Sequence, residues 1–176
     1  MFVAPCVTAS SANVTVEPDP RATWIAVNDA VMGGVSSGAV TREAGGALVF
    51  AGTVSFERGG GFASARRALA GDALPPLDAL SLRVLGDGKR YKLAAYTDAG
   101  TSGFAYQASF ETRAGETTVV VIPLASFEAR FRGRSVGDAP PLASGRIRAL
   151  GLVIADRQEG AFRLRVESIE AIVVGR

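Results

Sequence analysis

The chain has 176 residues, 48% of them hydrophobic, and its 19 lysines and arginines against 17 acids give a net charge of +2. It has no histidine and a single cysteine, Cys6, which excludes hydrolysis with a histidine base, zinc sites built on imidazole and an internal disulfide. No apolar run approaches the length of a membrane helix, so the composition predicts a packed core and no membrane insertion.

The first twenty residues are mildly apolar and rich in alanine and serine. They lack the basic region and apolar core of a secretory signal and the arginines of an organelle-targeting peptide. We expect a segment at 1–20 that is poorly ordered or forms an edge strand, followed by a single β-sandwich domain at 21–176. The default location is cytoplasmic, with periplasmic or organellar alternatives if the N-terminus is processed or wrongly assigned.

The stretch NDAVMGGVSSG at 28–38 has little helix or strand propensity. Adjacent Gly33 and Gly34 predict a tight turn with positive φ, and Asn28 and Asp29 are suited to accept hydrogen bonds from loop N–H groups. The stretch is therefore predicted to be scaffold, and its apolar residues are expected to pack into the end of the sandwich. No metal site is predicted, although Asp29 is the candidate ligand if the loop binds a cation such as calcium.

Further along the chain, apolar and polar residues alternate with a period of two between clusters of glycine and proline, which is typical of half-buried strands. The predicted strands are 47–56, 80–84, 91–97, 104–112, 117–123, 149–156 and 162–168, of which 47–56, 117–123 and 149–156 are evenly apolar and so predicted to be central. Asp87-Gly88 predicts a hairpin turn between two of them. The sequence therefore predicts an all-β fold, an antiparallel two-sheet β-sandwich of the jelly-roll type.

Polar residues at the non-core positions of neighbouring predicted strands suggest one exposed sheet face with an aromatic platform. This face, together with two arginines of the later FRGR stretch, gives the candidate ligand-binding residues Arg83, Lys92, Tyr96, Gln107, Arg132 and Arg134. Stacking on an aromatic ring beside fork-shaped donors suits recognition of a sugar or a peptide. The alternative is an ordinary solvated sheet face.

No catalytic residue is predicted. Asp29, Asp87, Asp98 and Asp156 lie at predicted turns or strand ends, and nothing in the sequence places two of them together as a glycosidase requires. An enzyme working through Asp, Arg and Tyr alone is the remaining catalytic alternative.

Nucleotide and nucleic-acid binding are not predicted either. The glycine-rich stretches 59–64 and 86–90 lack the spacing of phosphate-binding loops, so no cofactor is expected. RFRGR at 130–134 would indicate nucleic-acid binding only if it joined other arginines in one strip with exposed aromatic residues.

Several motifs occur in order: W-x-x-x-N-D-x-V-M-G-G-x-S at 24–36, F-x-G at 50–52, G-G-F-A-S at 60–64, L-R-x-x-G-D-G-K-R-Y-K at 82–92, Y-Q-x-x-F at 106–110 and F-R-G-R at 131–134. In this combination the chain resembles the complex I intermediate-associated protein 30 family, from about Trp24 onward. The resemblance implies a galactose-binding-like jelly roll. Its signature loop comprises Trp24, Asn28, Asp29, Met32, Gly33, Gly34 and Ser36.

Mitochondrial members of this family look like chaperones for the assembly of respiratory complex I and are not enzymes. The resemblance therefore implies a non-catalytic protein-binding module, whose partner is a respiratory-chain subunit or an assembly intermediate. The alternative is a carbohydrate- or small-ligand-binding domain that takes a saccharide, because the fold is widely used for sugar binding.

Overall fold

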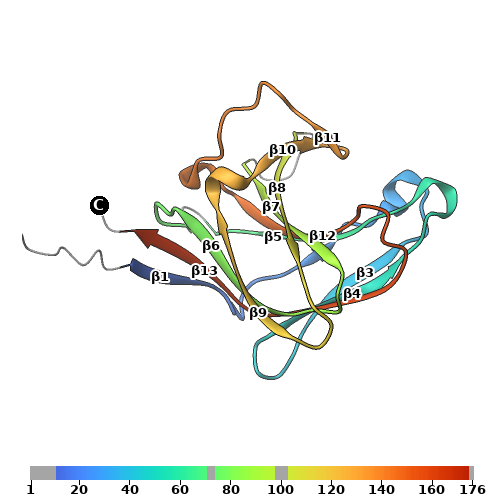
Figure 1. Cartoon of the computed structure of the whole chain (residues 1–176), viewed down its shortest axis with the longest axis horizontal. Helices are drawn as coiled ribbons and strands as arrows, with labels where there is room; N and C mark the ends of the chain where they lie inside the picture. The colour runs from blue at the N-terminus through green and yellow to red at the C-terminus, as the bar shows by residue number, and fades with distance from the viewer. Residues whose placement is uncertain (1–10, 71–73, 98–102, 175–176) are drawn as a thin grey trace, which may run out of the picture.

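The computed structural model of the chain describes residues 11–70, 74–97 and 103–174 (Figure 1). The strands are β1 (Ser11–Glu17), β2 (Ile25–Ala26), β3 (Ser37–Arg42), β4 (Leu48–Val54), β5 (Ala63–Ala68), β6 (Ala79–Leu85), β7 (Arg90–Tyr96), β8 (Ala105–Glu111), β9 (Thr117–Pro123), β10 (Glu128–Phe131), β11 (Arg134–Ser135), β12 (Ala149–Ile154) and β13 (Gly160–Val174). Short 3-10 helices are η1 (Asp29–Met32), η2 (Glu57–Gly59), η3 (Leu124–Ser126) and η4 (Ser144–Arg146). Cys6, Asp98 and the side chains of Val31 and Met32 lie outside the described parts.

Two antiparallel sheets pack face to face, which confirms the predicted sandwich (Figure 1). The first, here the β13 sheet, has the order β3-β4-β13-β6-β9, and β1 pairs with the end of β13. The second, here the β12 sheet, has the order β11-β10-β8-β7-β12-β5-β2. No helix in the described parts is long and apolar enough to cross a membrane.

The core lies between the sheets because each strand turns its alternate apolar residues inward. Leu80, Leu82, Leu93, Leu152 and Leu164 are completely buried there, and each contributes about 2 kcal/mol relative to an exposed position. The rings of Phe50 and Phe162 pack with their centroids 4.8 Å apart.

The strand β9 is an edge strand, so the prediction of a central strand at 117–123 is wrong. It pairs only with β6 among the described strands. Its even-numbered residues face inward, while Val119 and Val121 are 55% and 54% exposed. An evenly apolar sequence does not tell whether a strand is buried on both faces or lies at the edge of a sheet with apolar residues exposed.

Asp87-Gly88 is a crossing between sheets and not the predicted hairpin turn, because β6 pairs within the β13 sheet and β7 within the β12 sheet. The Asp87 carboxylate holds this crossing in place. It accepts hydrogen bonds from the Tyr91 hydroxyl (3.0 Å) and from the N–H groups of Lys89 (3.1 Å) and Arg163 (2.8 Å). Burial of Tyr91 and the nearby charge of Asp87 raise the pKa of the tyrosine.

Residues 11–17 of the expected N-terminal segment form β1, which ends in a buried ion network. Glu17 is 1% exposed and pairs with Arg67, which is 5% exposed, and with Arg42 at 3.3 Å. The indole of Trp24 donates to the same carboxylate at 3.2 Å and packs against the core. These contacts attach β1 and the start of the signature loop to the sandwich.

Candidate functional site

A groove of about 1120 Å³ crosses the outer face of the β12 sheet. Strand register explains its shape, because Glu128, Gln107, Ala94, Gly151 and Arg66 lie opposite one another on successive strands. Residues paired in this way point to the same face of a sheet. The two small residues in the middle of the row leave a low floor between longer side chains at its ends.

The ring of Tyr96 lies over this floor. A Cβ atom at Gly151 would come within 3.0 Å of the ring, so only glycine allows the ring this position. The guanidinium carbon of Arg66 sits 3.6 Å from the ring centroid, a cation–π arrangement. The expected aromatic platform therefore presents an arginine on that face instead of a bare ring.

The groove is strongly basic. Its basic side chains are Arg66, Arg90, Lys92, Arg130, Arg132 and Arg157, and its acidic side chains are Glu128 and Asp156. Half of these cations have a carboxylate partner: Lys92 pairs with Asp156 at 2.6 Å, Arg90 with Glu111 at 2.7 Å and Arg130 with Glu128 at 2.5 Å.

The other half of the cations are Arg66, Arg132 and Arg157. Their guanidinium groups form no ion pair or hydrogen bond with any described residue. The Nε atom of Arg66 is buried without a hydrogen-bond partner. Arg132 lies 5.4 Å from the ring of Phe131 and has no acid beside it. Positive charge in the groove is thus left unneutralised.

Unusual backbone conformations gather around the groove. The described non-glycine residues with positive φ are Arg58, Arg132, Asp156 and Arg157, at 54°, 48°, 62° and 58°. All except Arg58 line the groove, and Arg132 forms the β10–β11 turn with Gly133, whose φ is 79°. Each such residue costs roughly 1–2 kcal/mol, and residues of this kind cluster at functional sites.

Asp29 fixes one wall of the groove. Its carboxylate is completely buried and accepts hydrogen bonds from the N–H groups of Ser36 (3.0 Å), Gly61 (2.8 Å) and Phe62 (3.3 Å). Burial acts to raise the pKa of Asp29, but the hydrogen bonds from Ser36, Gly61 and Phe62 outweigh it and hold the pKa below its ordinary value of 3.8. Because Gly61 and Phe62 line the groove, the NDAVMGG stretch positions its rim.

The two adjacent glycines serve different purposes. Gly33 has a φ of 88°, as predicted. Gly34 has no positive φ and is needed for space, because a Cβ atom there would lie 2.4 Å from the carboxyl carbon of Asp29. Both oxygens of Asp29 accept hydrogen bonds from backbone N–H groups, so this carboxylate holds the loop to the strand-β5 side of the groove.

The structure brings together four of the predicted site residues, Lys92, Tyr96, Gln107 and Arg132, all of which line the groove. Arg134 is exposed on β11 outside the lining. Arg83 belongs to β6 in the other sheet, where it pairs with Glu167 at 2.7 Å. The expectation of one shared face is wrong for Arg83, because alternation identifies the inward side of a strand and does not tell to which sheet the strand belongs.

Sequence reasoning missed the remaining groove cations and two aromatic residues, Phe56 and Phe62. The strand β5 was not predicted because alanine and arginine have low strand propensity. A signal was present, since Ala63 and Ala65 alternate with Ser64 and Arg66.

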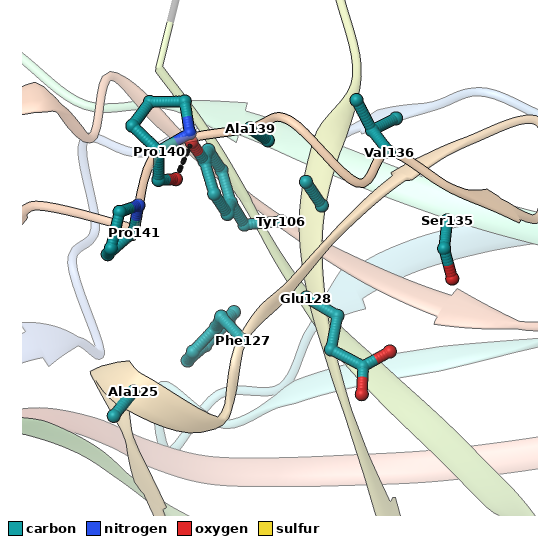
Figure 2. Close-up of a pocket in the computed structure, with 10 residues that line it drawn as sticks. Tyr106, Ala125, Phe127, Glu128, Ser135, Val136, Ala139, Pro140 and Pro141 are labelled. Atoms are coloured by element: carbon teal, nitrogen blue, oxygen red, sulfur yellow. Dashed lines mark hydrogen bonds between the residues drawn. The ribbon is translucent and has the colours of Figure 1, made fainter.

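A second, smaller pocket of about 460 Å³ lies beside β10 (Figure 2). Figure 2 shows the hydroxyl of Tyr106 donating to the carbonyl of Pro140, at 2.7 Å. Glu128 is the charged residue of its lining, which is otherwise largely apolar. The hydrogen bond attaches the loop before η4 to β8, so this pocket is better explained as loop packing than as a binding site.

Comparison with known proteins adds a family and a fold. The model of the family described as Complex I intermediate-associated protein 30 (CIA30) matches residues 15–166. No curated protein sequence matches significantly.

Several solved structures share the fold. One is a family 11 carbohydrate-binding module from Clostridium thermocellum in complex with a β-1,3-1,4-mixed-linked tetrasaccharide (TM-score 0.64, 15% identity, 94% of this chain and 97% of that chain). Another is the family 11 module of a cellulosomal cellulase from the same organism (TM-score 0.63, 14% identity, 96% and 98% of the two chains). A family 29 carbohydrate-binding module variant follows at a TM-score of 0.51 and 10% identity, covering 95% and 94%. At these identities the likeness shows the jelly-roll fold.

Proposed function

Because the chain belongs to the complex I intermediate-associated protein 30 family, we propose that it is a non-catalytic module that binds a protein partner, a respiratory-chain subunit or an assembly intermediate. The observation that carries the proposal is the family match over residues 15–166, which takes in nearly the whole sandwich. We further propose that the groove of the β12 sheet is the binding surface.

The chemistry of the groove supports binding over catalysis. Its two acids, Glu128 and Asp156, each pair with a cation, and the chain has no histidine. Hydrolysis requires an acid and a base that converge on one substrate, whereas each of these carboxylates is held by its own cation. Guanidinium groups without an ion-pair partner instead suit recognition of a partner.

Capture from the native host tests this function. The tagged protein is crosslinked in cells and recovered, and respiratory complex I subunits are quantified against the tag alone. The proposal predicts enrichment of defined complex I subunits or assembly intermediates. Repeated recovery without any such enrichment would contradict it.

Saccharide binding is the second candidate function. It is favoured by the groove itself, in which Tyr96 and Gln107 lie together, and by the likeness to a carbohydrate-binding module in complex with a tetrasaccharide. It is disfavoured by Arg66, which covers a face of Tyr96 where a sugar ring would stack. Titration calorimetry with a mixed-linkage tetrasaccharide tests this candidate. Binding with a dissociation constant below about 1 mM, and loss of that binding in Tyr96→Ala, would favour saccharide binding.

A further inference from the structure

We infer that the groove binds an acidic, extended segment of the partner protein, and that Arg66, Arg132 and Arg157 contact its carboxylates. The inference rests on the proposed function and names the chemistry of the partner. Charge complementarity carries it, because the groove has six basic side chains and two acidic ones.

The unpaired arginines make the groove incomplete without an anion. Lys92, Arg90 and Arg130 have their own carboxylates within 2.7 Å. Arg66, Arg132 and Arg157 have none in the described parts of the chain, and the Arg66 Nε donor is already removed from water. A guanidinium offers paired N–H donors whose spacing matches a carboxylate, so glutamate or aspartate side chains are the natural complement.

The dimensions of the groove indicate a short extended peptide. The lining runs over β10, β8, β7, β12 and β5, and four spacings of about 4.8 Å between neighbouring strands give about 19 Å. An extended chain covers that distance with roughly six residues.

Neutral groups in the groove suit a peptide backbone and apolar side chains. The side chains of Gln107 and Ser109 make no hydrogen bond with any described residue, and a glutamine amide can both donate to and accept from a peptide group. Phe56, 41% exposed, lies with Phe62 and Val153 in the same lining. The predicted segment therefore mixes acidic and apolar residues.

Nucleic acids and acidic sugars are negatively charged like an acidic peptide, but their binding sites also need open aromatic rings. Single-stranded nucleic acids and sugar rings gain affinity by stacking on open aromatic faces. Arg66 lies 3.6 Å above the ring of Tyr96, which removes a stacking face at the floor of the groove. A peptide needs no such face.

Fluorescence anisotropy with a labelled octapeptide of alternating glutamate and valine tests the inference on the full chain. The matched peptide has glutamine in place of glutamate. We expect the acidic peptide to bind at least about tenfold more tightly than the glutamine peptide, because hydrogen bonds between charged groups are stronger than hydrogen bonds to neutral groups. Added salt is expected to weaken binding of the acidic peptide more than binding of the glutamine peptide.

Matched double variants assign the contacts. Arg132→Asn with Arg157→Asn removes two groove cations, whereas Arg58→Asn with Arg146→Asn removes two exposed arginines outside the lining. The charge change is the same, and both pairs include a positive-φ arginine, at which asparagine is tolerated. We expect at least about tenfold weaker binding for the groove pair and less than about twofold for the control pair.

Equal loss in both double variants, or no preference for glutamate over glutamine, would overturn the inference. Tighter binding of oligogalacturonate, oligothymidylate or a mixed-linkage glucan than of the acidic peptide would also overturn it, because the occupant would be another class of polymer. If complex I subunits are captured equally by the wild type and the groove double variant, binding of a complex I partner stands, but the groove is not its binding surface and the inference fails. If the acidic peptide binds but no complex I subunit is captured, the proposed function fails instead.

Discussion

The outer face of the β13 sheet and the groove of the β12 sheet both carry several arginines, and the two faces differ in where the acids lie. On the β13 sheet, Arg83 and Arg165 both hydrogen-bond to Glu167, and Arg165 also pairs with Glu43 at 2.8 Å. In the groove, the side chains of Arg66, Arg132 and Arg157 form no ion pair with any described residue.

The difference separates a structural network from an available surface. Hydrogen bonds from Arg83 and Arg165 hold the pKa of Glu167 below its ordinary value, so this carboxylate stays ionised and its neighbours stay neutralised. Three of the six groove cations, Arg66, Arg132 and Arg157, form no ion pair with any described residue. The number of arginines in a sequence is therefore a poor guide to a binding surface, and the placement of the acids decides.

The largest expected effect comes from breaking the wall of the groove while leaving the β13 sheet intact. Gly34→Val should lower the free energy of unfolding by about 3 kcal/mol or more, because its side chain would overlap the buried Asp29 carboxylate. Chemical denaturation measures the change. Gly45→Ala is the control, since nothing lies within 4 Å of its added Cβ. A Gly34→Val protein with wild-type stability but no partner binding would mean that the loop is a contact surface instead.

Asp29→Asn should lower the free energy of unfolding by about 2 kcal/mol at neutral pH. In the wild type both carboxylate oxygens accept backbone N–H groups, and in the variant an NH₂ group would face one of these donors. The folded-state pKa of Asp29 is depressed, so its contribution is complete above the unfolded value of 3.8 and is lost as the pH falls through the folded value. Acid titrations of stability should therefore be shallower for the variant below about pH 4. Parallel curves for the two proteins would show that Asp29 is not the group responsible.

Arg66→Gln sharpens the comparison between unpaired and paired arginines. It should lower the affinity for the acidic octapeptide about tenfold, since a charged hydrogen-bond donor is removed. Its thermal stability should change little, because Arg66 has no acidic partner among the described residues. Arg83→Gln, tested in the same binding assay, should leave the affinity unchanged, and an equal loss at Arg83 would contradict the contrast between the faces.

The smallest effect is expected on the β13 sheet itself. Arg83 is 55% exposed at its side chain, so Arg83→Gln should change the free energy of unfolding by less than about 1 kcal/mol. The change should shrink further at high salt. A loss of several kcal/mol, measured by denaturation, would contradict this and indicate that the surface ion pairs contribute strongly to the stability of the fold.

Local sequence patterns located several of the longer strands, missed others such as β3 and β5, and could not assign any strand to a sheet. Alternation located β6, β7, β8 and β13, because burial of one face imposes a period of two. It could not place Arg83 on a different sheet from Lys92, since both β6 and β7 alternate in the same way. Sheet membership depends on pairing between residues distant in sequence, such as Arg83 with Ser168.

The candidate site was predictable only in part for a related reason. Tyr96 and Gln107 were found because they are polar positions on clearly alternating strands. Arg66 was missed because its strand is rich in alanine, and its position over Tyr96 follows from the register of three strands. The hydrogen bonds from Gly61 and Phe62 to Asp29 join residues more than thirty positions apart, so no local motif reveals that the NDAVMGG stretch builds the groove wall.

Mapping of amide chemical shifts tests most directly whether the groove of the β12 sheet is the binding face. The labelled protein is titrated with the acidic octapeptide or with a captured complex I subunit. Binding in the groove should give the largest chemical-shift changes at groove residues such as Gly61, Gln107 and Asp156. Shifts that instead gather on the exposed edge strand around Val119 and Val121, with the groove unchanged, would contradict it.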